Sequence, residues 1–249
     1  MGIIIKSERE IAIMRQAGRI VAMVLEILSR EIGPGMKTRE LDDIASREIE
    51  KLGAKPSFKG YRGFPASLCV SVNDEIVHGI PGDRVLNSGD IVSLDFGSVY
   101  DGFQGDAAVT VPVGDVSPEV KSLLEATRES LEAGIARAYA GGRIGDISAA
   151  VQRSVESKGY SVIREYTGHG IGRQMHEDPQ IPNFGQPGTG PLLKRGMVLA
   201  IEPMVSMGDW HTRVGDDRWT VYTADGSLAA HFENTIAVTD AEPEVLTVA

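Results

Sequence analysis

The sequence contains an internal repeat, in which residues of the first half match residues 106 or 107 positions later. This repeat constrains the fold more than any other feature. At a shift of 106 residues, Gly53, at the end of one helical segment, matches Gly159 at the end of another. At a shift of 107 residues, the run LNSG before IVSLDFG matches LKRG before VLAIEPM, which sets Asp95 on Glu202. A looser match sets DAAVTV on ENTIAV. The repeat predicts one domain, residues 1–249, with two pseudo-symmetric halves of about 7–113 and 117–240.

Both halves begin with helix signals. Ser7 opens a capping box, and apolar residues recur at helical spacing from there to Gly33. A second helix is expected from Thr38 to Leu52. In the second half, Ser117 caps a long helix that we expect to be interrupted at Gly141-Gly142. Each pair of helices is followed by strand-like runs, which predicts an α+β fold of two helix–helix–strand halves.

Five ionisable residues lie inside apolar or glycine-rich runs that read as strands: Asp95, Asp106, His169, Glu202 and Glu233. Taken alone, Asp95 would more simply be a hydrogen-bonded residue at a strand edge. Four carboxylates that converge would repel one another unless cations held them together. Oxygen ligands with a single histidine suit a pair of divalent metal ions, which hydrolases use to activate water and polarise a carbonyl group.

The alternation of residues along two of these runs predicts where the acids point. In strand 91–97, Asp95 lies on the face opposite Leu94, and in strand 197–202, Glu202 lies opposite Ile201. Helices would cover the apolar faces, and the acidic faces would line an open cleft floored by small residues. The repeat would bring the carboxylates of both halves to one centre, on a pseudo-twofold axis.

Composition excludes several classes of protein. The net charge of −10 and the pI of about 5.0 argue against a DNA-binding surface. The one cysteine, Cys69, excludes an internal disulfide and fits a reducing compartment. No apolar run is long enough to span a membrane, and the first residues lack a signal-peptide pattern. We therefore expect a cytoplasmic protein without a membrane partner.

The motifs around these residues resemble type I methionine aminopeptidase from Ser7 to the C-terminus. The segments that carry the resemblance are GYRGFPASLCVSVNDEIVHGIP, GDIVSLDFG, DGFQGDAAVT, YTGHGIGRQMHEDPQIPNFG, GMVLAIEPM and WTVYTADGSLAAHFENTIAV. The resemblance implies a pita-bread fold, with a curved antiparallel sheet between the two halves. It also implies removal of the initiator methionine from nascent proteins and peptides, with a preference for a small second residue.

The resemblance assigns the metal ligands one by one. Asp95 would bind one divalent ion, His169 and Glu202 would bind the other, and Asp106 and Glu233 would bridge both. The carboxylate-rich site would accept cobalt, manganese, iron or zinc. A water between the ions would attack the scissile carbonyl group, and the free amine of the substrate would lie near Asp95.

The resemblance also implies catalytic and substrate-binding residues. Glu202 would carry a proton from the water to the leaving amine, His176 would polarise the carbonyl group, and His78 would contact the substrate. The methionine side chain of the substrate would enter an apolar pocket. Phe58 lies near the first of the expected pocket residues in the sequence. Phe58 and Phe64 stand where many family members carry Cys and Tyr, and Met175 where Phe is frequent. The expected pocket residues are Tyr61, Phe64, Cys69, Met175 and Trp219.

Several readings compete with these assignments. His78 before Gly-Ile-Pro could be a turn residue, Tyr61 and Trp219 could be plain core aromatics, and Cys69 fits a pocket lining better than a nucleophile. We expect His211 and His231 to be structural or exposed.

Other functions compete as well. An Xaa-Pro peptidase would share all five ligands, although such relatives usually carry an additional N-terminal domain. A non-catalytic pita-bread binding protein or a creatinase-like, metal-free hydrolase would typically lack ligands that are present here. Transient ribosome association fits a family that acts on nascent chains, although the acidic net charge offers no support for tight contact with rRNA. For the oligomeric state, we expect a monomer.

Overall fold

The computed structural model describes residues 2–249, so that Met1, the first residue of the expected domain, lies outside the described residues. The main sheet within this range has nine strands in the order β1-β4-β5-β14-β9-β7-β8, with β2 paired to β4 and β15 paired to β14. The helices are α1 (Glu8–Glu31), α2 (Thr38–Lys51), α3 (Pro118–Ile135) and α4 (Ile144–Glu156). The main-sheet strands are β1 (Lys55–Pro56), β2 (Leu68–Val72), β4 (Ile91–Tyr100), β5 (Phe103–Pro112), β7 (Thr167–Gly170), β8 (Glu177–Pro182), β9 (Val198–Ile201), β14 (Glu233–Ala237) and β15 (Glu244–Val245).

Two three-stranded sheets flank the main sheet. One has the order β13-β10-β6, and the other has the order β11-β12-β3. Every strand pair in the described range is antiparallel. The strands of the two three-stranded sheets are β3 (Glu75–Val77), β6 (Ser161–Val162), β10 (Met204–Ser206), β11 (Thr212–Val214), β12 (Val221–Thr223) and β13 (Ala229–His231).

The helix starts agree with the signals in the sequence. Ser7 caps α1, and its backbone N–H donates to the carboxylate of Glu10, which completes the expected capping box. The third helix differs from expectation because it ends at Ile135, before Gly141-Gly142. The amides of Arg137 and Ala138 donate to the carbonyl groups three residues back, so a tighter turn replaces the helix.

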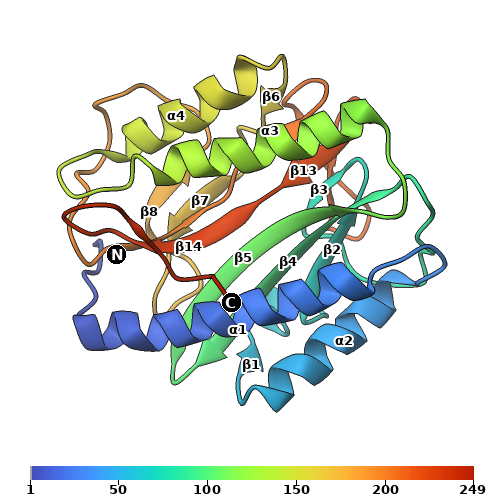
Figure 1. Ribbon diagram of the computed structural model, residues 1–249, viewed down its shortest axis with the longest axis horizontal. Coiled ribbons are helices and arrows are strands. Elements are labelled where there is room, and N and C mark those ends of the chain that lie inside the picture. Colours follow the sequence, from blue (N-terminus) through green and yellow to red (C-terminus); the bar gives the residue numbers. More distant parts are fainter. Residues whose placement is uncertain (1) are drawn as a thin grey trace.

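The helices lie on one side of the main sheet. In Figure 1, α1 and α3 cross in front of it with β5 and β14 visible between them, while α2 lies beside α1 and α4 beside α3. The helix α1 packs very close to β5. A Cβ atom added to Gly105 would lie only 2.7 Å from the backbone nitrogen of Gly18. Among the described residues, no helix combines the length and the apolarity needed to cross a membrane.

The alternation predicted for the central strands is confirmed by the cores. Leu94 and Phe96 pack with residues of α1 and α2 in one hydrophobic cluster. Leu199 and Ile201 pack with residues of α3 and α4 in another. The α-helices therefore cover the apolar face of these strands, and the opposite face carries the acids. The division of the chain into one domain with two repeated halves stays a prediction.

Candidate metal centre

The register of the central strands places the acidic side chains on one face of the sheet. Ala108 of β5 is opposite Asp95 of β4 on one side and opposite Glu233 of β14 on the other. Residues directly opposite each other in a sheet share a face, and so do residues two apart along a strand. Asp106 therefore shares this face, and the small side chain of Ala108 leaves the space between the three carboxylates open.

The remaining two side chains come from the next strands. His169 of β7 is opposite Ala200 of β9, and Glu202 lies two residues beyond Ala200, just past the end of that strand. Both side chains therefore extend from the same face as the first three. The strands β4, β5, β14 and β7 thus each contribute one ionisable residue, and the fifth follows β9 directly. Ala108 lies between Asp95 and Glu233, and Ala200 lies opposite His169.

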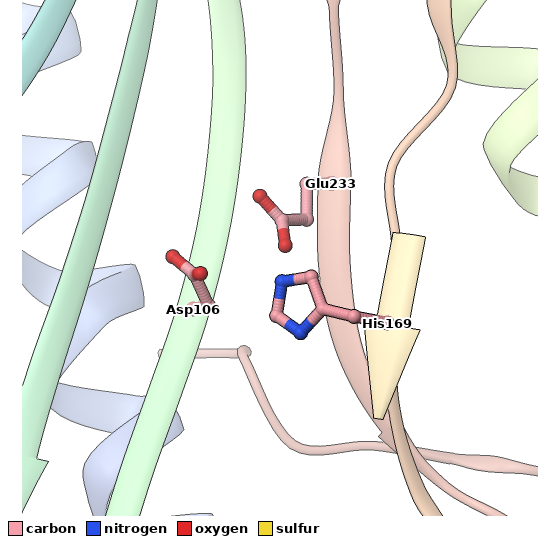
Figure 2. A group of neighbouring side chains, drawn as sticks. All are labelled: Asp106, His169 and Glu233. Carbon is pink, nitrogen blue, oxygen red and sulfur yellow. The ribbon is translucent and has the colours of Figure 1, made fainter. Parts of the chain in front are cut away.

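The side chains of this cluster converge. Figure 2 shows Asp106, His169 and Glu233 pointing toward one another from β5, β7 and β14, and their ligand atoms lie within 4.8 Å of one another. The Nε2 atom of His169 is 3.6 Å from Oε1 of Glu202. The Nδ1 atom of His169 lies 2.9 Å from the carbonyl oxygen of Gly170. Because a carbonyl oxygen only accepts, Nδ1 carries the proton and Nε2 has a free lone pair, as a metal ligand requires.

Burial and mutual repulsion disfavour the charged carboxylates. Burial raises the pKa of Asp95 to about 7. Burial together with neighbouring carboxylates raises the pKa values of Asp106, Glu202 and Glu233 well above their ordinary values. Burial lowers the pKa of His169 to about 3, so its imidazole is neutral. Positive charge bound at this site would favour the ionised carboxylates and lower these pKa values.

Unpartnered oxygen atoms show where that charge would bind. Asp95 Oδ1, Asp106 Oδ1 and Glu233 Oε1 are buried and have no hydrogen-bond partner among the described residues. Buried polar atoms without partners are rare in folded proteins and call for an unseen ion or water. Carboxylate oxygens with one neutral imidazole are the donor set of a divalent cation site. The residues present therefore fit a divalent metal ion.

A cavity of about 130 Å³ opens onto this cluster. Its apolar lining includes four of the five predicted pocket residues, Tyr61, Phe64, Cys69 and Trp219, together with Phe58. Met175 does not line the cavity but packs in the same hydrophobic cluster as Phe58, Phe64 and Cys69. The ring edge of Phe64 meets Trp219, with centroids 5.1 Å apart. The ligand cluster and an apolar, aromatic pocket thus share one space.

The two predicted catalytic histidines line the same cavity from different segments. His78 has a φ of 61°, a backbone conformation that is uncommon for a residue other than glycine. Its ring meets the edges of Tyr166 and Trp219, and burial lowers its pKa to about 4. His176 is exposed, and its Nδ1 atom is 2.8 Å from the hydroxyl oxygen of Tyr61.

Three lining or neighbouring residues were not among the predicted site residues: Phe58, Arg62 and His231. Arg62 lines the cavity and lies over the ring of Tyr61, in a turn where its φ of 49° is left-handed. Two glycines flank it in GYRGF, but they give no indication of a role. His231 is 1% exposed and lies beside Glu202 and Glu233, whereas His211 is exposed and bonded to Asp209.

The chain is similar to known peptidases in both sequence and structure. The model of metallopeptidase family M24 matches residues 12–240. Methionine aminopeptidase 1 of Bacillus subtilis (strain 168) is 56% identical over 245 residues, which cover 98% of this chain and 99% of that protein. A crystal structure of methionine aminopeptidase from Thermotoga maritima matches with a TM-score of 0.98 and 50% identity, and the match covers 100% of both chains.

A more distant likeness shows how far the scaffold extends. Xaa-Pro dipeptidase from Bacillus anthracis matches with a TM-score of 0.80 and 27% identity, covering 98% of this chain but 62% of that chain. These matches confirm the expected α+β pita-bread fold. The chain belongs to metallopeptidase family M24 and, within it, to the methionine aminopeptidases.

Proposed function

We propose that the protein removes the N-terminal methionine from peptides and nascent proteins by metal-dependent hydrolysis. The observation that carries this proposal is the shared space described above: a carboxylate-rich cluster with one neutral histidine opens into a pocket lined by Phe64, Cys69 and Trp219. The relatives that match over nearly their whole length bear the name methionine aminopeptidase.

The cluster would hold two divalent ions. Asp95 would bind one, His169 with Glu202 would bind the other, and Asp106 and Glu233 would contribute to both. The three unpartnered carboxylate oxygens, one each on Asp95, Asp106 and Glu233, are available as ligand atoms for such ions. Two such ions would supply Lewis-acid polarisation of the scissile carbonyl group and a water of lowered pKa. Manganese, iron, cobalt and zinc all suit these ligands.

The residues of the chain would then bind and orient the substrate. The free amine would approach Asp95, which restricts cleavage to the first residue. Glu202 would hold the proton of the attacking water and pass it to the leaving amine, because its carboxylate lies at the edge of the cavity beside His169. His176 would donate from Nε2 to the carbonyl oxygen of the substrate, since the hydroxyl of Tyr61 occupies its Nδ1. His78 would contact the substrate near the scissile bond.

The pocket would select methionine by its shape and polarisability. The thioether of a methionine side chain packs well against aromatic rings and against sulfur, which Phe64, Trp219 and Cys69 offer. A bulky second residue would meet the wall of the cavity, so small second residues would be preferred. We further propose that the protein acts as a cytoplasmic monomer that meets nascent chains at the ribosome.

Peptide cleavage by metal-free and metal-loaded protein tests the function. Chelator-stripped protein is reloaded with Mn²⁺ or Co²⁺ and incubated with a Met-Ala-Ser peptide and, in parallel, with an Xaa-Pro peptide. We expect metal-dependent release of methionine from Met-Ala-Ser alone. Cleavage of the Xaa-Pro peptide instead would change the assigned substrate. Metal binding without cleavage of either peptide would favour a binding protein on the same scaffold.

A further inference from the structure

A buried imidazole lies beside the proposed metal ligands without any hydrogen-bond partner of its own. Both ring nitrogens of His231 lack a partner among the described residues, and the residue is 1% exposed. Its backbone is fully bonded: the N–H donates to Thr110 Oγ1 at 2.8 Å, and the carbonyl oxygen accepts from the same hydroxyl at 2.8 Å. The backbone anchors the strand without the ring, so the ring itself calls for an explanation.

The ring faces two carboxylates of the cluster. Nε2 of His231 is 3.6 Å from Oε2 of Glu202 and 3.9 Å from Oε2 of Glu233. The other oxygen of Glu202, Oε1, is 3.6 Å from Nε2 of His169. The carboxylate of Glu202 therefore lies between two imidazoles, with one oxygen toward each.

The two imidazoles differ in their access to the cavity. His169, Glu202 and Glu233 line it, whereas His231 does not. His231 thus reaches the cluster through the carboxylates rather than from the lining of the cavity, and its ligand atom lies within 4.8 Å of those of Glu202 and Glu233. Nε2 of His231 can donate to Oε2 of Glu202 and leave Oε1, which faces His169, for an ion and for proton transfer. Partners of this kind fix the orientation of a metal ligand and raise its affinity for the ion.

We propose that His231 is a positioning residue for Glu202, with its Nε2–H donating to Oε2 when the cluster binds divalent metal. This role rests on the proposed function only in that Glu202 acts on substrate; the effect on metal affinity is independent of it. The bond holds Oε1 toward His169 and prevents the carboxylate from rotating. His231 would also hold Oε2 of Glu233, at the longer of the two separations.

Two substitutions separate the ring nitrogen from the ring volume. His231→Gln keeps an N–H donor of similar reach, whereas His231→Leu fills the space without one. His211→Leu is the matched control, since His211 also contacts a carboxylate, that of Asp209, but at the surface. Each metal-free protein is titrated with Mn²⁺ by isothermal calorimetry, its thermal midpoint is measured, and kcat and KM for Met-Ala-Ser are determined.

We expect His231→Leu to weaken Mn²⁺ binding by about 10- to 100-fold, the usual effect of losing such a partner. Its kcat should fall at saturating Mn²⁺ with little change in KM, because Glu202 would be misplaced during proton transfer. His231→Gln should restore most of both properties, and His211→Leu should match the wild type. The two proposals can also fail separately. If His231→Leu binds Mn²⁺ more weakly but the wild-type protein cleaves neither peptide, the positioning role is supported and the proposed function is rejected.

Three results would overturn the positioning role. The first is wild-type Mn²⁺ affinity and kcat in His231→Leu. The second is an equal loss in His231→Leu and His231→Gln with lowered thermal midpoints of both metal-free proteins, which would make the ring a packing element only. The third is loss of a whole equivalent of bound Mn²⁺ in both variants, which would make His231 a direct ligand.

Discussion

Without a bound cation, each carboxyl group at the centre of the sheet has a pKa above its ordinary value. For Asp95, burial is the cause, and the pKa rises to about 7 from an ordinary value of 3.8. The folded, metal-free protein therefore binds more protons than the unfolded chain between these two pH values. Stability contributed by this group is highest below about 4 and falls as the pH rises toward 7.

A pH series of metal-free protein tests this dependence. The difference in unfolding free energy between the wild type and Asp95→Asn should shift against the wild type as the pH rises from 4 to 7, because only the wild type must ionise a buried carboxyl group. Urea unfolding at each pH measures it. A difference that is constant over this range would show that Asp95 ionises freely in the folded protein.

A substitution at the exposed residue His176 distinguishes a role in catalysis from a role in metal binding. His176→Ala should lower kcat by about 10²- to 10³-fold, the range for losing one donor to a developing oxyanion. Metal content should not change, because the ring binds Tyr61 rather than a carboxylate. Steady-state kinetics with elemental analysis measures both. Equal losses of metal and of rate would assign His176 a structural role instead.

At the scale of elements, a buried ion pair ties the N-terminal segment to the loop that carries His176. Lys6 Nζ is 2.7 Å from Oε2 of Glu177, and the two side chains are 3% and 6% exposed. The backbone N–H of Lys6 donates to Gly196, and Oε1 of Glu177 accepts from the amide of Gln174. The pair therefore fixes the segment just before β8 against the start of the chain.

Breaking this pair should destabilise the fold and disturb catalysis together. Lys6→Met leaves the carboxylate of Glu177 buried and uncompensated, so the unfolding free energy should fall by about 3–5 kcal/mol. Arg195→Met is the control, because its pairs with Glu8 and Asp240 are exposed and such pairs contribute about 0–1 kcal/mol. Denaturant unfolding measures both changes. Equal effects of the two substitutions would contradict the role given to burial.

At the scale of the whole molecule, a metal centre would join the two halves of the chain. Asp95 and Asp106 come from the first half, and His169, Glu202 and Glu233 come from the second. The central pair β5 and β14 connects the halves through the register of Ala108 with Glu233. Ions bound across this pair would stabilise the folded state over the unfolded chain, which has no preformed site.

Metal addition should therefore raise the thermal midpoint of the metal-free protein. At a concentration 100 times Kd, a ligand that binds only the folded state adds about 2.7 kcal/mol of stability. Asp106→Asn should abolish most of this gain and lower the bound stoichiometry at both positions, because Asp106 would bridge them. Asp216→Asn, at an exposed aspartate, is the control. Unchanged stoichiometry in Asp106→Asn would reject a bridging role.

Much of this architecture could be predicted because local patterns carry it. The capping residues Ser7 and Ser117 mark where two helices begin, and alternation along 91–97 separates Leu94 from Asp95. The end of the third helix could not be predicted in the same way. The turn after Ile135 forms through backbone hydrogen bonds that any residue can make, so Gly141 was a misleading signal.

By itself, the sequence determined which residue types could meet: the period-two pattern places Asp95 and Glu202 opposite the apolar faces of their strands, and the repeat matches Asp106 with Glu233. Only the tertiary structure decided the distances and the surroundings of those residues. It placed His231 beside Glu202, and it placed Met175 in the hydrophobic cluster around the pocket rather than in its lining. The physical reason is that strand pairing joins residues far apart in the chain, and burial, which sets their charge, arises only when the sheets and helices pack.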